Sequence, residues 1–199
     1  MIQRRAIPWE VESLRLFDPV TTEVERPRWR SLSQDKSMVA ITRRPSDKCV
    51  HLPSYVSGYV DGEGCFCVSL RPQPRNRIGW EVRPSFSVSQ NSDRAELIRE
   101  LPVLFGCGTI RPDRSDRTIK FEIRSLGRLI DSVLPFFERH PLQSSKQEDF
   151  ITFGLICKLM LTGLHHEKRG LLFIADLASS MNTGGIRRYT TKMIDDSLR

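Results

Sequence analysis

Residues 54–64, which read Ser-Tyr-Val-Ser-Gly-Tyr-Val-Asp-Gly-Glu-Gly, constrain the fold more than any other stretch of this chain. The apolar residues of this stretch have the spacing of one helix face: Tyr55, Val56, Tyr59 and Val60. The run from Asp61 to Gly64 cannot continue a helix, so a carboxylate is expected at the helix end. Gly58 costs about 1 kcal/mol relative to Ala inside a helix, which indicates that another backbone comes close to it. These features predict a metal site at an interface.

The chain has an excess of basic residues, with 31 Lys and Arg against 24 Asp and Glu and a formal net charge of +7. Such a charge attracts polyanions, so nucleic acid is the leading candidate partner. Charge alone leaves the question open, because many basic proteins bind nothing acidic. A length of 199 residues with 39% hydrophobic residues predicts one globular domain with an extension.

The five cysteines are an odd number without a repeated two-residue spacing, which argues against a zinc ribbon and against a disulfide scaffold. We interpret Cys65 and Cys67 as small core or near-core residues in a reducing compartment. No apolar run approaches the roughly 20 residues that a membrane-spanning helix needs. The N-terminus also has no signal-type apolar stretch, so we expect a soluble, non-secreted protein without a membrane partner.

Residues 1–48 have mixed charge, scattered prolines and no sustained period, so we expect a poorly ordered extension there. A basic arm and part of a transit peptide are the alternatives. The seven Asp and Glu among these residues weaken the second alternative, since transit peptides are poor in acids. The domain itself is expected at 49–190, followed by a short tail at 191–199.

After the motif the hydrophobic period changes from helical to two, which predicts strands. We expect strands at 66 to about 75, 80–90, 109–111 and 118–123. Helical spacing predicts helices at 95–101, 126–137, 145–161 and 165–181, the first of them bent or ended by Pro102. The order helix, two strands, helix, two strands, helices predicts an α+β domain with a mostly antiparallel sheet backed by helices on one face.

The polar face of these strands is basic and rich in hydroxyl groups. Such a face can lie against a groove of duplex DNA, with Arg reading guanine and Gln or Ser adapting to other bases. A solvated sheet face is the alternative. The candidate DNA-binding residues are Ser69, Arg71, Gln73, Arg75, Arg83, Ser87, Arg111 and Lys120.

Residues 56–64 resemble the LAGLIDADG motif, and from about Leu52 to Thr190 the chain is similar to the single-motif LAGLIDADG homing endonucleases encoded in introns. Three later segments carry the same resemblance: residues 86–90 (Phe-Ser-Val-Ser-Gln), 105–108 (Phe-Gly-Cys-Gly) and 144–147 (Ser-Ser-Lys-Gln). The resemblance implies an αββαββα domain whose antiparallel sheet forms a DNA-binding saddle, with helices on the other face.

The resemblance also implies roles for individual residues. Glu63 occupies the acidic position that binds the divalent metal, and the carbonyl of Gly62 is the backbone ligand beside it. Gln90 matches the residue that orients water, Arg94 the nearby basic residue, and Lys146 the lysine that activates water or stabilises charge. Asp61 matches the acid that ties down the helix end. Structural alternatives stay open: a buried amide for Gln90, a surface lysine for Lys146 and a phosphate clamp for Arg94.

The chain holds one copy of the motif, and one Glu is too few ligands for a metal site. We therefore expect a homodimer with twofold symmetry, in which both Glu63 side chains meet at the axis and share two or three Mg²⁺ ions. The expected interface residues are Val56, Ser57, Gly58 and Asp61. The expected activity is metal-dependent cleavage of both strands of a DNA site. An RNA-binding intron maturase and a non-cleaving DNA-binding protein are the alternatives, in an organelle or a bacterial cytoplasm.

Overall fold

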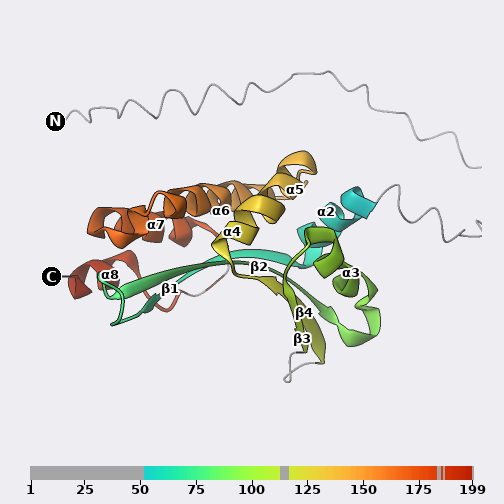
Figure 1. Ribbon diagram of the computed structural model, residues 1–199, viewed down its shortest axis with the longest axis horizontal. Helices are drawn as coiled ribbons and strands as arrows, with labels where there is room; N and C mark the ends of the chain where they lie inside the picture. The colour runs from blue at the N-terminus through green and yellow to red at the C-terminus, as the bar shows by residue number, and fades with distance from the viewer. Residues whose placement is uncertain (1–51, 113–116, 183–184, 186, 199) are drawn as a thin grey trace, which may run out of the picture. The chain divides into compact units, whose positions relative to one another are not determined.

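The computed structural model of the protein describes residues 52–112, 117–182, 185 and 187–198. The expected extension at 1–48 lies outside these residues. The described residues belong to one compact unit, Pro45–Arg199 (Figure 1). Its main elements are α2 (Leu52–Glu63), β1 (Gly64–Pro72), β2 (Trp80–Asn91), α3 (Glu96–Phe105), β3 (Thr109–Pro112), β4 (Thr118–Ile123), α4 (Leu126–Arg128), α5 (Leu134–Arg139), α6 (Lys146–Leu161), α7 (Lys168–Ser180) and α8 (Thr191–Ser197).

The four strands form one antiparallel sheet in the order β1-β2-β4-β3. Phe66 on β1 lies opposite Phe86 on β2, which in turn lies opposite Ile123 on β4. All three side chains are buried, so the apolar phase of neighbouring strands is in register. Figure 1 shows the long helices over one face of the sheet, which bends away from them so that its other face is concave. The predicted α+β class and element order are confirmed.

The core beneath the helices is built around phenylalanine rings. The ring of Phe66 lies 5.1 Å from that of Phe86, 5.4 Å from that of Phe137 and 5.4 Å from that of Phe153. Each such side chain contributes about 1.5–3 kcal/mol when fully buried. The cluster therefore ties β1 and β2 to the helices α5 and α6. Gly108, with φ of +101°, completes the turn into β3 where an added Cβ would meet the ring of Phe121.

The ends of β1 and α3 differ from the prediction. Strand β1 ends at Pro72, and residues 73–79 form a turn in which the amide of Gln73 donates to the carbonyl of Gly79 at 2.7 Å. Gln73 and Arg75 therefore lie in the turn rather than on the strand, because Pro72 and Pro74 cannot donate to a ladder. Helix α3 continues past Pro102 to Phe105, since Leu101 and Phe105 are buried and hold its last turn against the sheet.

The helical segments also depart from the prediction in detail. The predicted helix at 126–137 is a continuous helical run made of α4, one π-helical turn (Leu129–Val133) and α5. Two single 3-10 turns, Ser92–Arg94 and Leu164–His166, precede α3 and α7. The second turn replaces the helix start expected at 165, whereas the first lies before α3, which begins at Glu96, one residue after the expected start.

Residues 191–197 form helix α8 and belong to the packed domain rather than to a tail. Ile194 is fully buried, and the indole nitrogen of Trp80 donates to the hydroxyl of Ser197 at 2.9 Å. The ring of Tyr189 meets that of Trp80 edge-on at 5.1 Å. Helix α8 therefore covers the start of β2, which a pattern search over seven residues could not reveal.

Candidate active site and DNA-binding face

One face of helix α2 packs against the rest of its own domain. Val56 and Val60 are fully buried, and Ser57 is 6% exposed. The hydroxyl of Ser57 donates to the carbonyls of His140 and Pro141, at 2.8 and 3.1 Å. Val56 and Ser57 are therefore engaged within the chain, and their prediction as dimer-interface residues is wrong. Helical spacing put them beside Gly58, but the loop before α6 covers their side of the helix.

The opposite side of α2 carries Tyr55, Gly58, Tyr59 and Gly62, which we call the α2 outer stripe. All of them are exposed except Tyr59, which is half-buried. Tyr55 is 60% exposed, and a Cβ added at Gly58 or Gly62 would meet no atom within 4 Å. The hydroxyl oxygen of Tyr59 is buried and makes no close hydrogen bond with any of the described residues. Burial raises the pKa of Tyr59, the amide of Gln90 works in the opposite direction, and the charge of Glu63 raises it further. Gln90 therefore lies beside Tyr59 of the motif helix, and the charge of Glu63 acts on the Tyr59 hydroxyl.

Lys146, the first residue of α6, reaches the end of α2. Its ammonium donates to the carbonyls of Gly64 at 2.6 Å and Val60 at 3.0 Å, and lies 3.5 Å from the carbonyl of Gly62. Carbonyls at a helix C-terminus have no partners within the helix and carry partial negative charge, so a cation is stabilised there. The structure brings Lys146 to the motif, next to the backbone oxygen expected to bind metal.

Asp61 is bound to the loop that precedes α6. Its carboxylate accepts from the amide of Gln143 at 2.6 Å and from the hydroxyl of Ser144 at 2.7 Å. Burial works to raise the pKa of Asp61, but these hydrogen bonds and the charge of Lys146 together lower it below its ordinary value. Asp61 therefore ties the motif helix to the start of α6, as its match to the motif implied, and its place at a dimer interface stays a prediction.

Glu63 is the last residue of α2 and is exposed. It makes no hydrogen bond or ion pair with any residue that the structure describes. A carboxylate and the adjacent Gly62 carbonyl are hard oxygen donors, the type that Mg²⁺ and Ca²⁺ prefer. Across 52–112, 117–182, 185 and 187–198, no three His, Cys, Asp or Glu side chains come together as a metal site. The donors present suit a divalent cation but do not enclose one within a single chain.

Gln90 and Arg94 differ in how closely they approach this site. Gln90, at the end of β2, is half-buried and accepts from the amide of Asn91 at 2.8 Å. Arg94 lies in the 3-10 turn with its side chain 78% exposed and 4.0 Å from Asp93. Gln90 thus lies beside the motif helix, whereas Arg94 points into solvent.

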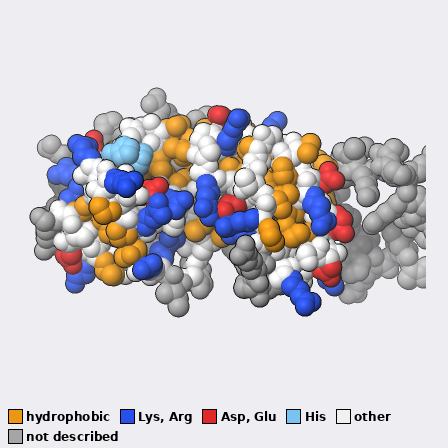
Figure 2. Space-filling model, turned by 60° about the horizontal axis from the view of Figure 1, so that its bottom comes forward, with side chains coloured by type: hydrophobic (Ala, Val, Ile, Leu, Met, Phe, Trp, Pro, Cys, Tyr) orange, Lys and Arg blue, Asp and Glu red, His pale blue; other side chains and the backbone are white. Residues whose placement is uncertain are grey.

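The concave side of the sheet, which we call the free face, carries the alternate residues of each strand: Cys65, Cys67, Ser69, Arg71, Glu81, Arg83, Ser85, Ser87, Ser89, Thr109, Arg111, Lys120 and Glu122. Figure 2 turns this side toward the viewer and shows Lys and Arg side chains spread across it, with acidic side chains among them. Ser69, Arg71, Arg83, Arg111 and Lys120 lie on it as predicted. Their contact with DNA stays a prediction.

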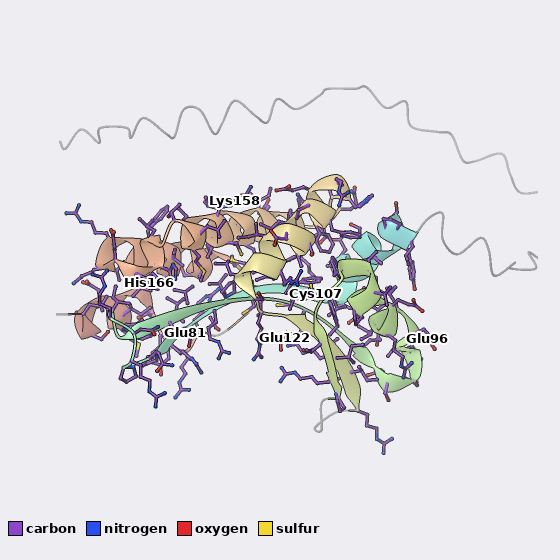
Figure 3. The ribbon with its side chains drawn as sticks, in the orientation of Figure 1. Glu81, Glu96, Cys107, Glu122, Lys158 and His166 are labelled. Carbon is purple, nitrogen blue, oxygen red and sulfur yellow. The ribbon has the colours of Figure 1, made fainter. Side chains whose placement is uncertain are left out.

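Two acids on the free face were missed as functional candidates. The carboxylate of Glu81 forms an ion pair with Arg71 at 2.6 Å and lies 3.9 Å from Arg83. Glu122 forms ion pairs with Arg111 and Arg124. Both acids are labelled on the concave side in Figure 3. The sequence pattern indicates both acids, because they alternate along their strands in the same phase as the basic residues.

Ser87 does not offer a surface to a ligand. It lies on the free face between Cys65 of β1 and Glu122 of β4 in the strand register, and only 5% of it is exposed. Its predicted contact with DNA is therefore not supported, because almost none of its surface is accessible.

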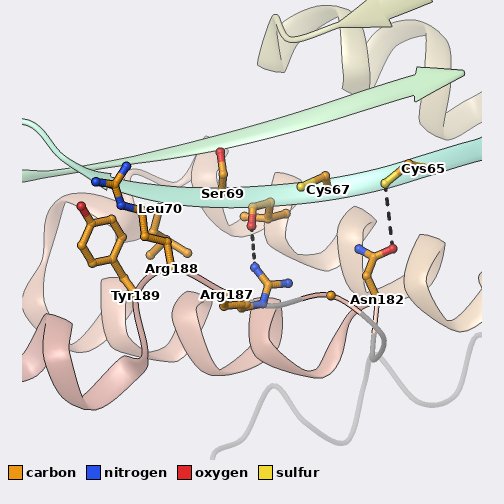
Figure 4. A pocket seen from close by; sticks show the side chains of 10 residues that line it. Cys65, Cys67, Ser69, Leu70, Asn182, Arg187, Arg188 and Tyr189 are labelled. Atoms are coloured by element: carbon orange, nitrogen blue, oxygen red, sulfur yellow. Dashed lines mark hydrogen bonds between the residues drawn. The ribbon is translucent and has the colours of Figure 1, made fainter. Parts of the chain in front are cut away.

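Cys65 and Cys67 are half-buried on the free face and line a hollow of about 300 Å³ beside the edge strand β1 (Figure 4). The segment after α7 forms its other wall: the Asn182 amide donates to the carbonyl of Phe66 at 2.8 Å, and Arg187 donates to that of Val68 at 2.9 Å. Burial raises the pKa of the Cys65 thiol. The two side chains thereby occupy carbonyls of an edge strand that would otherwise be open.

Among the described residues, no helix is long and apolar enough to cross a membrane.

Comparison with known proteins identifies the family. The family model described as LAGLIDADG endonuclease matches residues 56–157, from the motif helix through the sheet to α6. "Probable intron-encoded endonuclease 2" of Neurospora crassa is 32% identical over 133 residues, which are 66% of this chain and 29% of that protein. This chain therefore spans less than a third of that relative.

Two solved structures resemble the described fold. The crystal structure of the homing endonuclease I-TnaI has a TM-score of 0.68 at 36% identity, over 74% of this chain and 97% of that one. I-SmaMI bound to an uncleaved DNA target in the presence of calcium ions has a TM-score of 0.64 at 33% identity, over 68% of this chain and 46% of that one. The family model covers about half of the chain, and the chain belongs to the LAGLIDADG endonuclease family.

Proposed function

We propose that this chain is a site-specific DNA endonuclease that cleaves both strands of a long, nearly palindromic duplex as a Mg²⁺-dependent homodimer. The observation that carries the proposal is the placement of Glu63. Its carboxylate is exposed and unpaired among the described residues, at the end of α2, where the first strand of the free face begins. An acid in that position can meet a phosphodiester lying along the sheet.

The chemistry of the site supports this reading. Phosphodiester hydrolysis needs an aligned water nucleophile and neutralisation of charge on the phosphoryl oxygens. A divalent cation bound by Glu63 and the Gly62 carbonyl would supply both. Calcium ions accompany DNA in the solved I-SmaMI complex, which supports a divalent cation here. Lys146 adds positive charge 3.5 Å from the Gly62 carbonyl, and Gln90 presents an amide beside the motif helix that can orient water.

The homodimer follows from what one chain lacks. One Glu63 and one carbonyl leave most of the coordination shell of a cation unfilled. Apart from the half-buried Tyr59, the α2 outer stripe is exposed, rich in glycine and has room at Gly58 and Gly62, as close helix packing across a twofold axis requires. This chain matches 46% of the I-SmaMI chain, so two copies of it correspond in extent to one chain of that protein. We propose the stripe as the dimer interface in place of Val56 and Ser57.

The free face supports duplex DNA as the substrate. Its exposed basic residues are spread over four strands, and arginine is the side chain best suited to bidentate contact with guanine. DNA is part of the solved I-SmaMI complex, whose fold this chain shares. We propose Ser69, Arg71, Arg83, Arg111 and Lys120 as the base and phosphate contacts, with Gln73 and Arg75 reaching DNA from the turn. Intron RNA as a ligand and an organellar or bacterial location stay predictions.

The Glu63→Gln variant tests the activity. The variant keeps the size of the side chain but removes the charge that binds the cation, so cleavage of a genomic DNA pool in Mg²⁺ should be lost while binding persists. Glu138→Gln is the matched control, because Glu138 pairs with Lys158 in the helix layer, away from the sheet. Robust cutting by Glu63→Gln, with cut ends mapped by sequencing, would overturn the proposal. A protein that stays monomeric by light scattering on its mapped target would overturn the dimer.

A further inference from the structure

Glu122 occupies the middle of the free face. In the strand register it lies opposite Ser87 on β2 and opposite Thr109 on β3, so it has neighbours on both sides. Only 8% of it is exposed, although it lies on the concave side of the sheet (Figure 3). A carboxylate in this position has lost most of its water and requires partners.

Three basic side chains supply those partners. Arg124 approaches both carboxylate oxygens, at 2.9 and 3.1 Å, and Arg111 lies 3.2 Å from one of them. Lys120 lies 3.9 Å away. The side chain of Arg111 is 54% exposed, that of Lys120 31% and that of Arg124 50%. One buried acid therefore holds three cations that still face outward.

Glu122 and the two arginines, without Lys120, also line a hollow. Its volume is about 370 Å³, and Arg128 joins Arg111, Arg124 and Glu122 in its wall. Glu81, the other acid of the free face, is arranged differently: its side chain is 32% exposed and it has one close partner, Arg71. An ion pair exposed in this way contributes little to stability, whereas a buried acid with several partners restricts the directions of its partners' side chains.

We propose that Glu122 is a positioning residue that determines the sequence specificity of DNA binding. By holding the two guanidinium groups in fixed directions, it lets Arg111 and Arg124 meet base edges in one register. By cancelling one of three positive charges, it limits the attraction of the cluster to the phosphates of any sequence. The inference rests on the proposed function, since it assigns the free face to duplex DNA.

Two variants separate charge from geometry. Glu122→Gln keeps the shape but releases the cations, so a fixed random-sequence duplex should bind more tightly, and the slope of log K against log[KCl] should steepen by about 0.9 for one added phosphate contact. Glu122→Asp keeps the charge but withdraws the carboxylate by one methylene, so the slope should stay the same. In a selection from a randomised DNA pool in Ca²⁺, both variants should lose about tenfold in discrimination at the base pairs that Arg111 and Arg124 read. Other positions of the site should keep their preference.

Glu138→Gln is again the control, because it changes the net charge equally without touching the sheet. An unchanged salt slope and an unchanged selection profile in Glu122→Gln would overturn the proposal. If that variant fails to fold, an unchanged profile in Glu122→Asp has the same meaning. A flat profile for the wild-type protein would reject the proposed function itself, whereas a sharp wild-type profile that both variants reproduce rejects the role of Glu122 alone.

Discussion

The ammonium of Lys146 lies 2.6 Å from the carbonyl oxygen of Gly64, a residue 82 positions earlier in the chain. A lysine at the first position of α6 is poorly placed for its own helix, whose N-terminus favours anions. The C-terminal carbonyls of α2 compensate for this, because they favour a cation. One side chain thus couples the ends of two helices at the candidate active site.

Lys146→Met should lower both stability and cleavage. Methionine keeps much of the length but leaves the carbonyls of Gly64 and Val60 without a charged donor, a loss of about 1–2 kcal/mol in the free energy of unfolding. Urea unfolding measures the loss of stability, and a cleavage assay at a temperature where the variant is folded measures the loss of activity. Lys158→Met, on the same helix but 64% exposed, should change stability by less than about 0.5 kcal/mol. Wild-type stability in Lys146→Met would contradict the helix-coupling role.

Asp61→Asn should reveal a pH-dependent contribution to stability. Because the folded-state pKa of Asp61 is lowered, its contribution is fully present above the ordinary pKa near 4 and is lost as pH falls through the folded value. At pH 7 the wild-type protein should exceed the variant by about 1 kcal/mol, since Asn retains one acceptor for Gln143 and Ser144. The difference should shrink below about pH 4.

Urea unfolding at several pH values measures the effect of Asp61→Asn. Asp93→Asn is its control, because among the described residues the one ion-pair partner of Asp93 is the exposed Arg94, 4.0 Å away. A stability difference that stays constant from pH 7 to pH 3 would show that the charge of Asp61 has no part in holding the loop before α6.

Gly58→Ala should stabilise the single chain and weaken its self-association. Inside a helix Ala is favoured over Gly by about 0.8–1 kcal/mol, and the added Cβ meets no atom of the described residues within 4 Å. In a dimer packed through the α2 outer stripe, the same Cβ would separate the two helices. Unfolding at low protein concentration and sedimentation equilibrium at high concentration measure the two effects.

Gly127→Ala is the matched control for Gly58→Ala, because Gly127 is also helical, exposed and open. It should stabilise the chain without changing association. Equal association in all three proteins would place the dimer interface somewhere other than the α2 outer stripe.

Local sequence patterns predicted the features that depend on residues close together in the chain. The alternation of Phe66, Val68 and their neighbours predicted β1 and its two faces, because a strand has period two. The motif helix and the position of Glu63 at its end were predicted in the same way. Patterns failed where two small neighbours, Ser57 and Gly58, were assigned to one interface although they lie on different sides of α2.

The amino-acid sequence was therefore enough to establish the order of elements, the basic phase of the strands and the acid at the end of the motif helix, since each depends on residues close in the chain. The packed structure alone revealed which side of α2 is covered, what Lys146 and Asp61 bind, and which acids hold the cations of the free face. These relationships join residues far apart in the chain or on separate strands, such as Glu122 with Arg111. They are set by how the layers pack, because distances between distant segments are not encoded in any local period.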